Sequence, residues 1–191
     1  MCLGGKGSRS EVFLAHLSYF WIMSAFTTFF QSPIGLLEIT GTDTSVHSIL
    51  FVETERRPLA PQPASAGEIP ATIKETMRQL NEYFEGKRLT FDLPLQPKGT
   101  DFQQHIWNLL LDIPYGVTTS YLEISKRYGD TKAIRAVGAA NGSNPITIII
   151  PCHRVIGSNG KLVGYGGDLW RKEWLLKHEM EHAPTPQGKL F

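Results

Sequence analysis

A run of four isoleucines and one threonine at residues 146–150 constrains this chain more than any other feature. Short, continuous and β-branched runs are typical of fully buried β-strands. Pro151 would end such a strand, because proline has no N–H to donate to a ladder. Cys152 follows at once, with a histidine and an arginine behind it. Neighbouring cationic groups lower a cysteine pKa, so this segment predicts a reactive thiolate and not a buried structural cysteine.

The sequence PCHRV at 151–155 resembles the active-site motif of the O6-alkylguanine-DNA alkyltransferases, the methylated-DNA–protein-cysteine methyltransferases, in their bacterial stand-alone form. Further family segments with family spacing extend the resemblance over most of residues 23–179: FDLPL at 91–95, IPYG at 113–116, RAVG at 135–138, NP at 144–145, GYGG at 164–167 and RKEWLLKHE at 171–179. The resemblance implies a single, irreversible alkyl transfer from guanine O6 in duplex DNA to Cys152, without a cofactor. It also implies that the damaged nucleotide is flipped out of the helix.

The order of local patterns predicts an α/β (α+β) fold. Strand-like runs at 34–40 and 48–52, with a turn before each, predict a small antiparallel sheet. Apolar spacing predicts an amphipathic helix over 71–84. The resemblance makes this part a ribonuclease H-like scaffold domain, for which we expect bounds of 23–96. A proline-rich loop is expected at 58–70.

The second half, residues 97–182, is expected to be a mainly helical DNA-binding and alkyl-transfer domain. A capping box at Thr100 predicts a helix over 101–112, and a second box at Ser120 predicts a short helix to Tyr128. After a turn at Gly129, Asp130 is expected to cap a helix over 131–141. Two short helices joined this way predict a helix-turn-helix. Residues 1–22 are expected to be a poorly ordered extension, with a targeting segment as the alternative, and 183–191 a flexible tail.

The second helix of this pair has small side chains that would let it approach a partner backbone closely. Between residues 121 and 161, six basic residues stand against two acidic ones, which favours contact with phosphates. Arg135 is the long cationic side chain midway along the helix. The resemblance implies that Arg135 inserts into the duplex where the base has left, and that Ala136 and Gly138 contact DNA.

Roles for the reacting groups follow from the resemblance. Cys152 would be the nucleophile, His153 a general base acting through a bound water, and Glu179 the group that orients the imidazole. The spacing of Glu179 with two leucines independently predicts that its carboxylate faces the core and needs a partner. Asn144 would hold the active-site turn, with capping of the preceding helix as a compatible role. Tyr121 would lie near the target phosphate and help to protonate the departing guanine.

The resemblance also places four residues in the substrate pocket: Pro145, Tyr165, Gly166 and Lys172. Gly166 stands where some members of the family have a serine near guanine O6. A side-chain donor is therefore missing there, which leaves the range of alkyl groups open, as well as activity on O4-alkylthymine.

Cysteine usage argues against a disulfide-stabilised fold and against a zinc site. The two cysteines, Cys2 and Cys152, are far apart, so a disulfide framework is not supported, and no cluster has zinc-ligand spacing. A net charge of +1 decides nothing about a polyanionic partner. We expect a monomer with no metal and no membrane span, in the cytoplasm, or in the nucleus of a eukaryote.

Two other functions stay open. One is a lesion-binding module without chemistry, although such relatives lack the cysteine. The other is a cysteine hydrolase that uses Cys152, His153 and Glu179, which would need an oxyanion hole and multiple turnovers. Fusion to a transcriptional regulator is disfavoured by the length of 191 residues.

Overall fold

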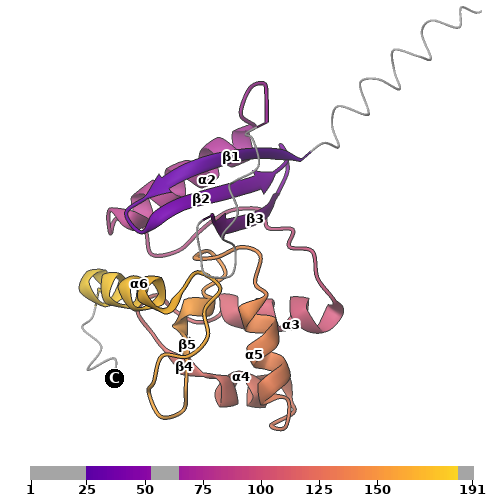
Figure 1. Ribbon diagram of the computed structural model, residues 1–191, viewed down its shortest axis with the longest axis vertical. Coiled ribbons are helices and arrows are strands. Elements are labelled where there is room, and N and C mark those ends of the chain that lie inside the picture. Colours follow the sequence, from indigo (N-terminus) through magenta and orange to yellow (C-terminus); the bar gives the residue numbers. More distant parts are fainter. Residues whose placement is uncertain (1–24, 53–64, 185–191) are drawn as a thin grey trace, which may run out of the picture.

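The computed structural model describes residues 25–52 and 65–184 (Figure 1). The expected extension at 1–22, and most of the expected 58–70 loop and C-terminal tail, lie outside the described residues. The described part has a sheet-and-helix half above a mainly helical half (Figure 1). The predicted α/β (α+β) class is therefore correct.

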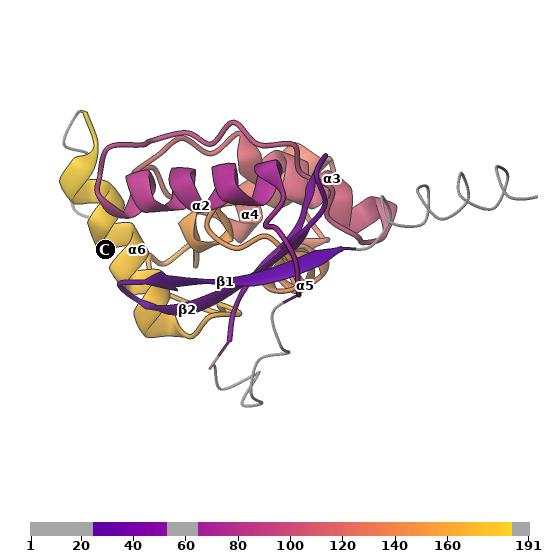
Figure 2. The same cartoon turned by 90° about the horizontal axis from the view of Figure 1, so that it is seen from above.

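The upper half is a three-stranded antiparallel sheet in the order β1-β2-β3, formed by Phe26–Ser32, Gly35–Gly41 and Val46–Phe51. Strands β1 and β2 are joined by a two-residue turn, in which Ser32 pairs with Gly35. Gly35 has a φ of 119°, which favours glycine at this position. The predicted helix is present as α2, Ala71–Phe84, and lies across one face of the sheet (Figure 2).

The lower half contains the predicted helix-turn-helix. Helix α3, Asp101–Leu111, begins at the expected capping box of Thr100 and Gln103. Helix α4, Tyr121–Tyr128, is capped by the Ser120 hydroxyl and ends at Gly129, whose φ is 98°. Helix α5 spans Ile134–Gly142 and starts later than predicted. The Asp130 carboxylate accepts from Lys132 N at 2.8 Å, so it stabilises the turn before α5 instead of capping the helix.

The predicted strand at 146–150 is wrong. Only Ile146 forms a β-bridge, to Ile49 at the edge of β3, and residues 147–149 form a turn. Ile148 has a φ of 72°, a conformation that costs a β-branched residue free energy. All five side chains are buried, as a strand would also have buried them. Burial and β-branching therefore could not distinguish a buried turn from a buried strand.

One hydrophobic core runs through both halves. It includes Ile39 and Ile49 of the sheet, Tyr83 of α2, Trp107 of α3 and Leu175 of the last helix. That helix, α6, spans Leu169–His182. Its N-cap is Asp168, which makes no side-chain capping hydrogen bond. The two-stranded parallel pair of β4, Thr119–Ser120, and β5, Val155–Ile156, connects α4 to the active-site segment.

Candidate active site

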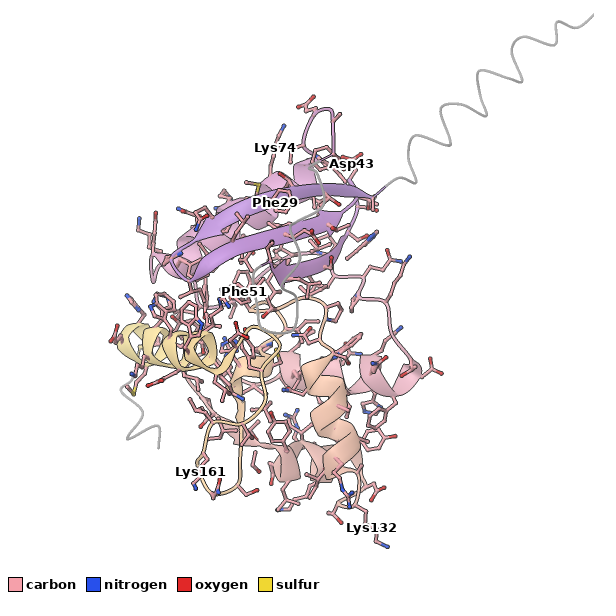
Figure 3. The ribbon with its side chains drawn as sticks, in the orientation of Figure 1. Phe29, Asp43, Phe51, Lys74, Lys132 and Lys161 are labelled. Atoms are coloured by element: carbon pink, nitrogen blue, oxygen red, sulfur yellow. The ribbon has the colours of Figure 1, made fainter. Side chains whose placement is uncertain are left out.

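Cys152 begins a single 3₁₀ turn, η1, that spans Cys152–Arg154 between the buried turn and β5. Its backbone N–H donates to the carbonyl of Ile150 at 2.8 Å, so the chain reverses tightly around Pro151. The thiol is 4% exposed and lines a cavity of about 290 Å³. The cavity wall combines residues of β3, the end of α5, the buried turn and the loop before α6: Leu50, Phe51, Asn141, Gly142, Ser143, Asn144, Pro145, Thr147, Tyr165, Gly166 and Gly167. Figure 3 shows Phe51 on the side of the sheet that faces the helical half.

Asn144 connects the thiol to the backbone of the turn. Its Nδ2 donates to the carbonyl of Ile150 at 2.8 Å and to Cys152 Sγ at 3.1 Å. Its Oδ1 accepts from Ile146 N at 3.0 Å. One buried amide therefore closes both ends of the turn and also supplies an N–H to the sulfur, where it stabilises a thiolate.

The resting state of the thiol differs from the prediction. Burial raises the pKa of Cys152, and this outweighs the Asn144 hydrogen bond and the positive charge of Lys172, which lower it. The arginine that follows in sequence was expected to favour the thiolate. Instead it is paired with Glu179, so its charge is already compensated. Cys152 therefore rests as a thiol and needs a base when it reacts.

His153 and Glu179 form the pair that the sequence suggested. His153 Nε2 lies 2.8 Å from Glu179 Oε1, and both side chains are fully buried. Burial lowers the pKa of His153 despite the opposing carboxylate, so the imidazole is neutral near pH 7. Because the carboxylate accepts, Nε2 carries the hydrogen and Nδ1 has the lone pair. His153 Nδ1 has no hydrogen-bond partner among the described residues. The imidazole is thus oriented with a basic nitrogen unoccupied.

Sequence reasoning missed three further partners of Glu179. Arg154 donates through Nε to Oε2 at 2.8 Å and through Nη2 to Oε1 at 2.9 Å. Tyr83 OH donates to Oε1 at 2.9 Å, and Gly116 N donates to Oε2 at 3.1 Å. Burial alone would raise the pKa of Glu179, but the contacts with His153 and Arg154 hold it below its usual range. An acidic residue on a core-facing stripe is a signal for one buried cation, and here Arg154 meets that need.

The buried position of Arg154 also reduces the positive charge that residues 121–161 were expected to offer to phosphates. Arg154 is 6% exposed and is not available to phosphates. Arg127 pairs with Asp112 at 2.6 Å, and Lys126 pairs with Glu123 at 3.3 Å. Lys132 and Lys161 are exposed at the end of the molecule farthest from the sheet (Figure 3). The positive charge of this surface is therefore smaller than the sequence count suggested.

Lys172 does not line the cavity, although it was expected in the pocket wall. It is fully buried, and its Nζ donates to the carbonyls of Val155 at 2.6 Å and Val163 at 2.9 Å. Burial lowers its pKa to about 8. Tyr121 OH donates to the same Val163 carbonyl at 3.2 Å. Both side chains therefore hold the loop that leads from β5 to the cavity.

The other expected pocket residues do line the cavity. Tyr165 is buried, and its hydroxyl lies 2.7 Å from Thr147 Oγ1, a partner that sequence reasoning missed. Pro145 and Gly166 lie on the wall. A Cβ at Gly166 would have its nearest neighbour, the carbonyl oxygen of Gly142, at 3.6 Å. The cavity therefore has space for a larger residue at Gly166.

The residues expected to contact DNA lie on α5. Arg135 and Ala136 are exposed, and Gly138 is half-buried beside Tyr121. Burial, followed by the charge that Cys152 carries when its thiol is ionised, raises the pKa of Tyr121 to about 12. Tyr121 therefore keeps its proton at neutral pH and can donate it. This helix and the cavity share residues 141 and 142, so a partner bound along α5 would reach the mouth of the cavity.

Within residues 25–52 and 65–184, no three His, Cys, Asp or Glu side chains are grouped so that they could hold a metal ion. Cys2 lies outside the described residues. The helices of the described part include none that is long and apolar enough to cross a membrane.

Comparison with protein families gives matches over both halves. The family model described as 6-O-methylguanine DNA methyltransferase, ribonuclease-like domain, matches residues 25–97. The model described as 6-O-methylguanine DNA methyltransferase, DNA binding domain, matches residues 101–181. The first match ends at residue 97 and the second begins at residue 101.

Individual proteins give the same result. A methylated-DNA–protein-cysteine methyltransferase of Methanosarcina acetivorans is 47% identical over 78% of this chain and 95% of the relative. The crystal structure of the Mycobacterium tuberculosis O6-methylguanine methyltransferase is 43% identical, with a TM-score of 0.73 over 85% of this chain and 96% of that one. The M. tuberculosis protein OGT in complex with DNA is 46% identical, with a TM-score of 0.70 over 83% and 94%. The chain therefore belongs to the methylated-DNA–protein-cysteine methyltransferase family.

Proposed function

We propose that this chain repairs DNA by moving the alkyl group of a flipped O6-alkylguanine onto Cys152, once per molecule. The observation that carries the proposal is the position of Cys152 Sγ. It lines a cavity of about 290 Å³, an Asn144 N–H points at it, and the neighbouring imidazole is oriented by a buried carboxylate. A nucleophile, its base and a group that orients the base are the parts that thiol attack requires.

The proposed chemistry starts from the thiol. His153 Nδ1 takes the thiol proton through a bound water, and the Glu179 carboxylate stabilises the imidazolium that forms. Cys152 Sγ then attacks the alkyl carbon, so that the S–C bond forms as the C–O6 bond breaks. The electron pair of the broken bond stays on the guanine. Tyr121, with a pKa of about 12, donates a proton to the departing base and recovers one from His153. The net reaction moves the thiol proton to guanine.

The product is a thioether, which this set of residues has no means to cleave, so we propose stoichiometric repair. The test mixes the protein with duplex DNA that carries one O6-methylguanine and measures intact and peptide mass. A gain of one methyl group on the Cys152 peptide, saturating at one per molecule and absent in Cys152→Ala, is expected.

Other results would support other functions. Lesion binding without any mass gain would indicate a binding module without chemistry. Repeated turnover on an ester substrate, with no methyl transfer, would indicate a cysteine hydrolase. The mass measurement separates methyl transfer from both alternatives, and an ester assay separates the binding module from the hydrolase.

We further propose alkylated double-stranded DNA as the partner, read by α5 with Arg135 inserted into the duplex in place of the base. Arg135 is exposed on this helix, and the small residues Ala136, Gly138 and Ala139 that follow it allow close approach. We propose that the chain acts as a monomer in the cytoplasm, or in the nucleus of a eukaryotic source. Size-exclusion chromatography with and without DNA tests the oligomeric state.

A further inference from the structure

Asn141 lies in the last turn of α5 and lines the cavity of Cys152. It is 2% exposed. The amide of Asn144 is used at both ends, on the turn and on the thiol. The amide of Asn141 is used only at its nitrogen, because its Oδ1 has no hydrogen-bond partner among the described residues.

The nitrogen end of Asn141 is fixed by its surroundings. Its Nδ2 donates to the carbonyl of Cys152 at 3.4 Å. A carbonyl can only accept, so the nitrogen of the Asn141 amide must face the Cys152 carbonyl, and the oxygen is the end without a partner.

A buried acceptor without a donor is costly, and such groups are normally paired. The wall of a substrate cavity is a place where the donor can come from the ligand. Alkylation at O6 leaves guanine N1 without a hydrogen. The exocyclic amine at C2 is then the one N–H donor on the Watson–Crick edge, the edge by which flipped bases are read.

We propose that Asn141 Oδ1 accepts a hydrogen bond from the 2-amino group of the flipped O6-alkylguanine and thereby selects it over bases without that group. The inference rests on the proposed function, since it names a contact of the same substrate. O6-alkylhypoxanthine lacks the 2-amino group, and O4-alkylthymine offers no N–H at all on this edge. Asn141 is thus a specificity-determining residue of the alkyl-transfer site.

The test compares two duplexes that differ only in the 2-amino group, one with O6-methylguanine and one with O6-methylhypoxanthine. The rate of methyl transfer to Cys152 is measured by mass for each duplex, and the ratio of the two rates is the readout. Poor folding of a variant lowers both rates equally and leaves the ratio unchanged. The variants are Asn141→Leu, of similar size, and Asn141→Ala, which both remove the acceptor.

The expected result is a fall of about tenfold in the ratio for both variants, since one hydrogen bond to a buried group contributes on the order of a factor of ten. The fall should come from slower transfer with O6-methylguanine. Asn108→Leu, at an exposed asparagine of α3, should leave the ratio unchanged. An unchanged ratio in both Asn141 variants would overturn the inference. Failure of the unsubstituted chain to take a methyl group from either duplex would instead overturn the proposed function.

Discussion

Arg154 and Glu179 form a buried bidentate ion pair, with Nε 2.8 Å from Oε2 and Nη2 2.9 Å from Oε1. Arg154 comes two residues after Cys152, and Glu179 lies in α6. The same carboxylate accepts from His153, so one pair both fastens α6 to the active-site segment and sets the charge next to the imidazole.

We expect Arg154→Met to lower the free energy of unfolding by about 3–5 kcal/mol, because it leaves the Glu179 carboxylate buried without its cation. Urea unfolding followed by circular dichroism measures the change. Arg127→Met breaks the exposed pair with Asp112 and should cost less than about 1 kcal/mol. Equal losses in the two variants would contradict the structural role of the buried pair.

Glu179 should contribute to acid unfolding. Its pKa in the folded chain lies below its usual value of 4.5, so the unfolded chain binds more protons in this range. Its contribution to stability is therefore present above about pH 4.5 and is lost as the pH falls toward the folded pKa. Glu179→Gln should flatten the dependence of unfolding free energy on pH below about 4.5, measured by urea unfolding. An unchanged acid slope would show that Glu179 is not a source of it.

Asn144→Ala should raise the pKa of the Cys152 thiol further, because it removes the N–H that stabilises the thiolate. The rate of Cys152 modification by iodoacetamide should then rise only at higher pH than in the unsubstituted chain. Peptide mass against time at several pH values measures the shift. Asn108→Ala, at an exposed position on α3, serves as the control and should reproduce the original curve.

Gly166→Ser and Gly167→Ala should differ sharply. A Cβ at Gly166 meets its first neighbour at 3.6 Å, so we expect Gly166→Ser to change stability by no more than about 0.5 kcal/mol. Its hydroxyl adds a donor to the cavity wall and should speed alkyl transfer from O6-methylguanine. A Cβ at Gly167 would lie 2.5 Å from the ring of Phe51, and Gly167→Ala should cost about 1–3 kcal/mol. Thermal unfolding of the two variants tests the difference in stability, and the methyl-transfer rate of Gly166→Ser tests the effect of the added hydroxyl.

Arg135→Ala should weaken binding to lesion-bearing duplex DNA by about 1–3 kcal/mol without changing stability. The physical reason is that an exposed side chain on α5 contributes to the DNA surface but not to the core. Fluorescence anisotropy at fixed salt measures the affinity. Lys177→Ala removes an exposed cation of α6 that pairs with Glu173 and should bind normally. Loss of affinity in both variants would point to general charge and not to Arg135.

Local rules determined much of this protein. The capping residues Thr100 and Ser120 placed the starts of α3 and α4, since capping depends on a few neighbouring residues. The spacing of Glu179 with two leucines placed its carboxylate on the core side of α6. The sequence by itself also predicted Cys152 as the candidate nucleophile, and the family resemblance supplied the expected chemistry.

Only the tertiary structure decided the rest, because the deciding contacts join residues far apart in sequence. The isoleucine run 146–150 became a turn since Asn144 closes it and β3 offers it a single bridge. Arg154 became a buried partner of Glu179 instead of a cation for the thiol. Lys172 does not line the cavity, because its Nζ donates to the carbonyl of Val155. Burial and pairing change the charge that a side chain presents, and neither can be read from its neighbours along the chain.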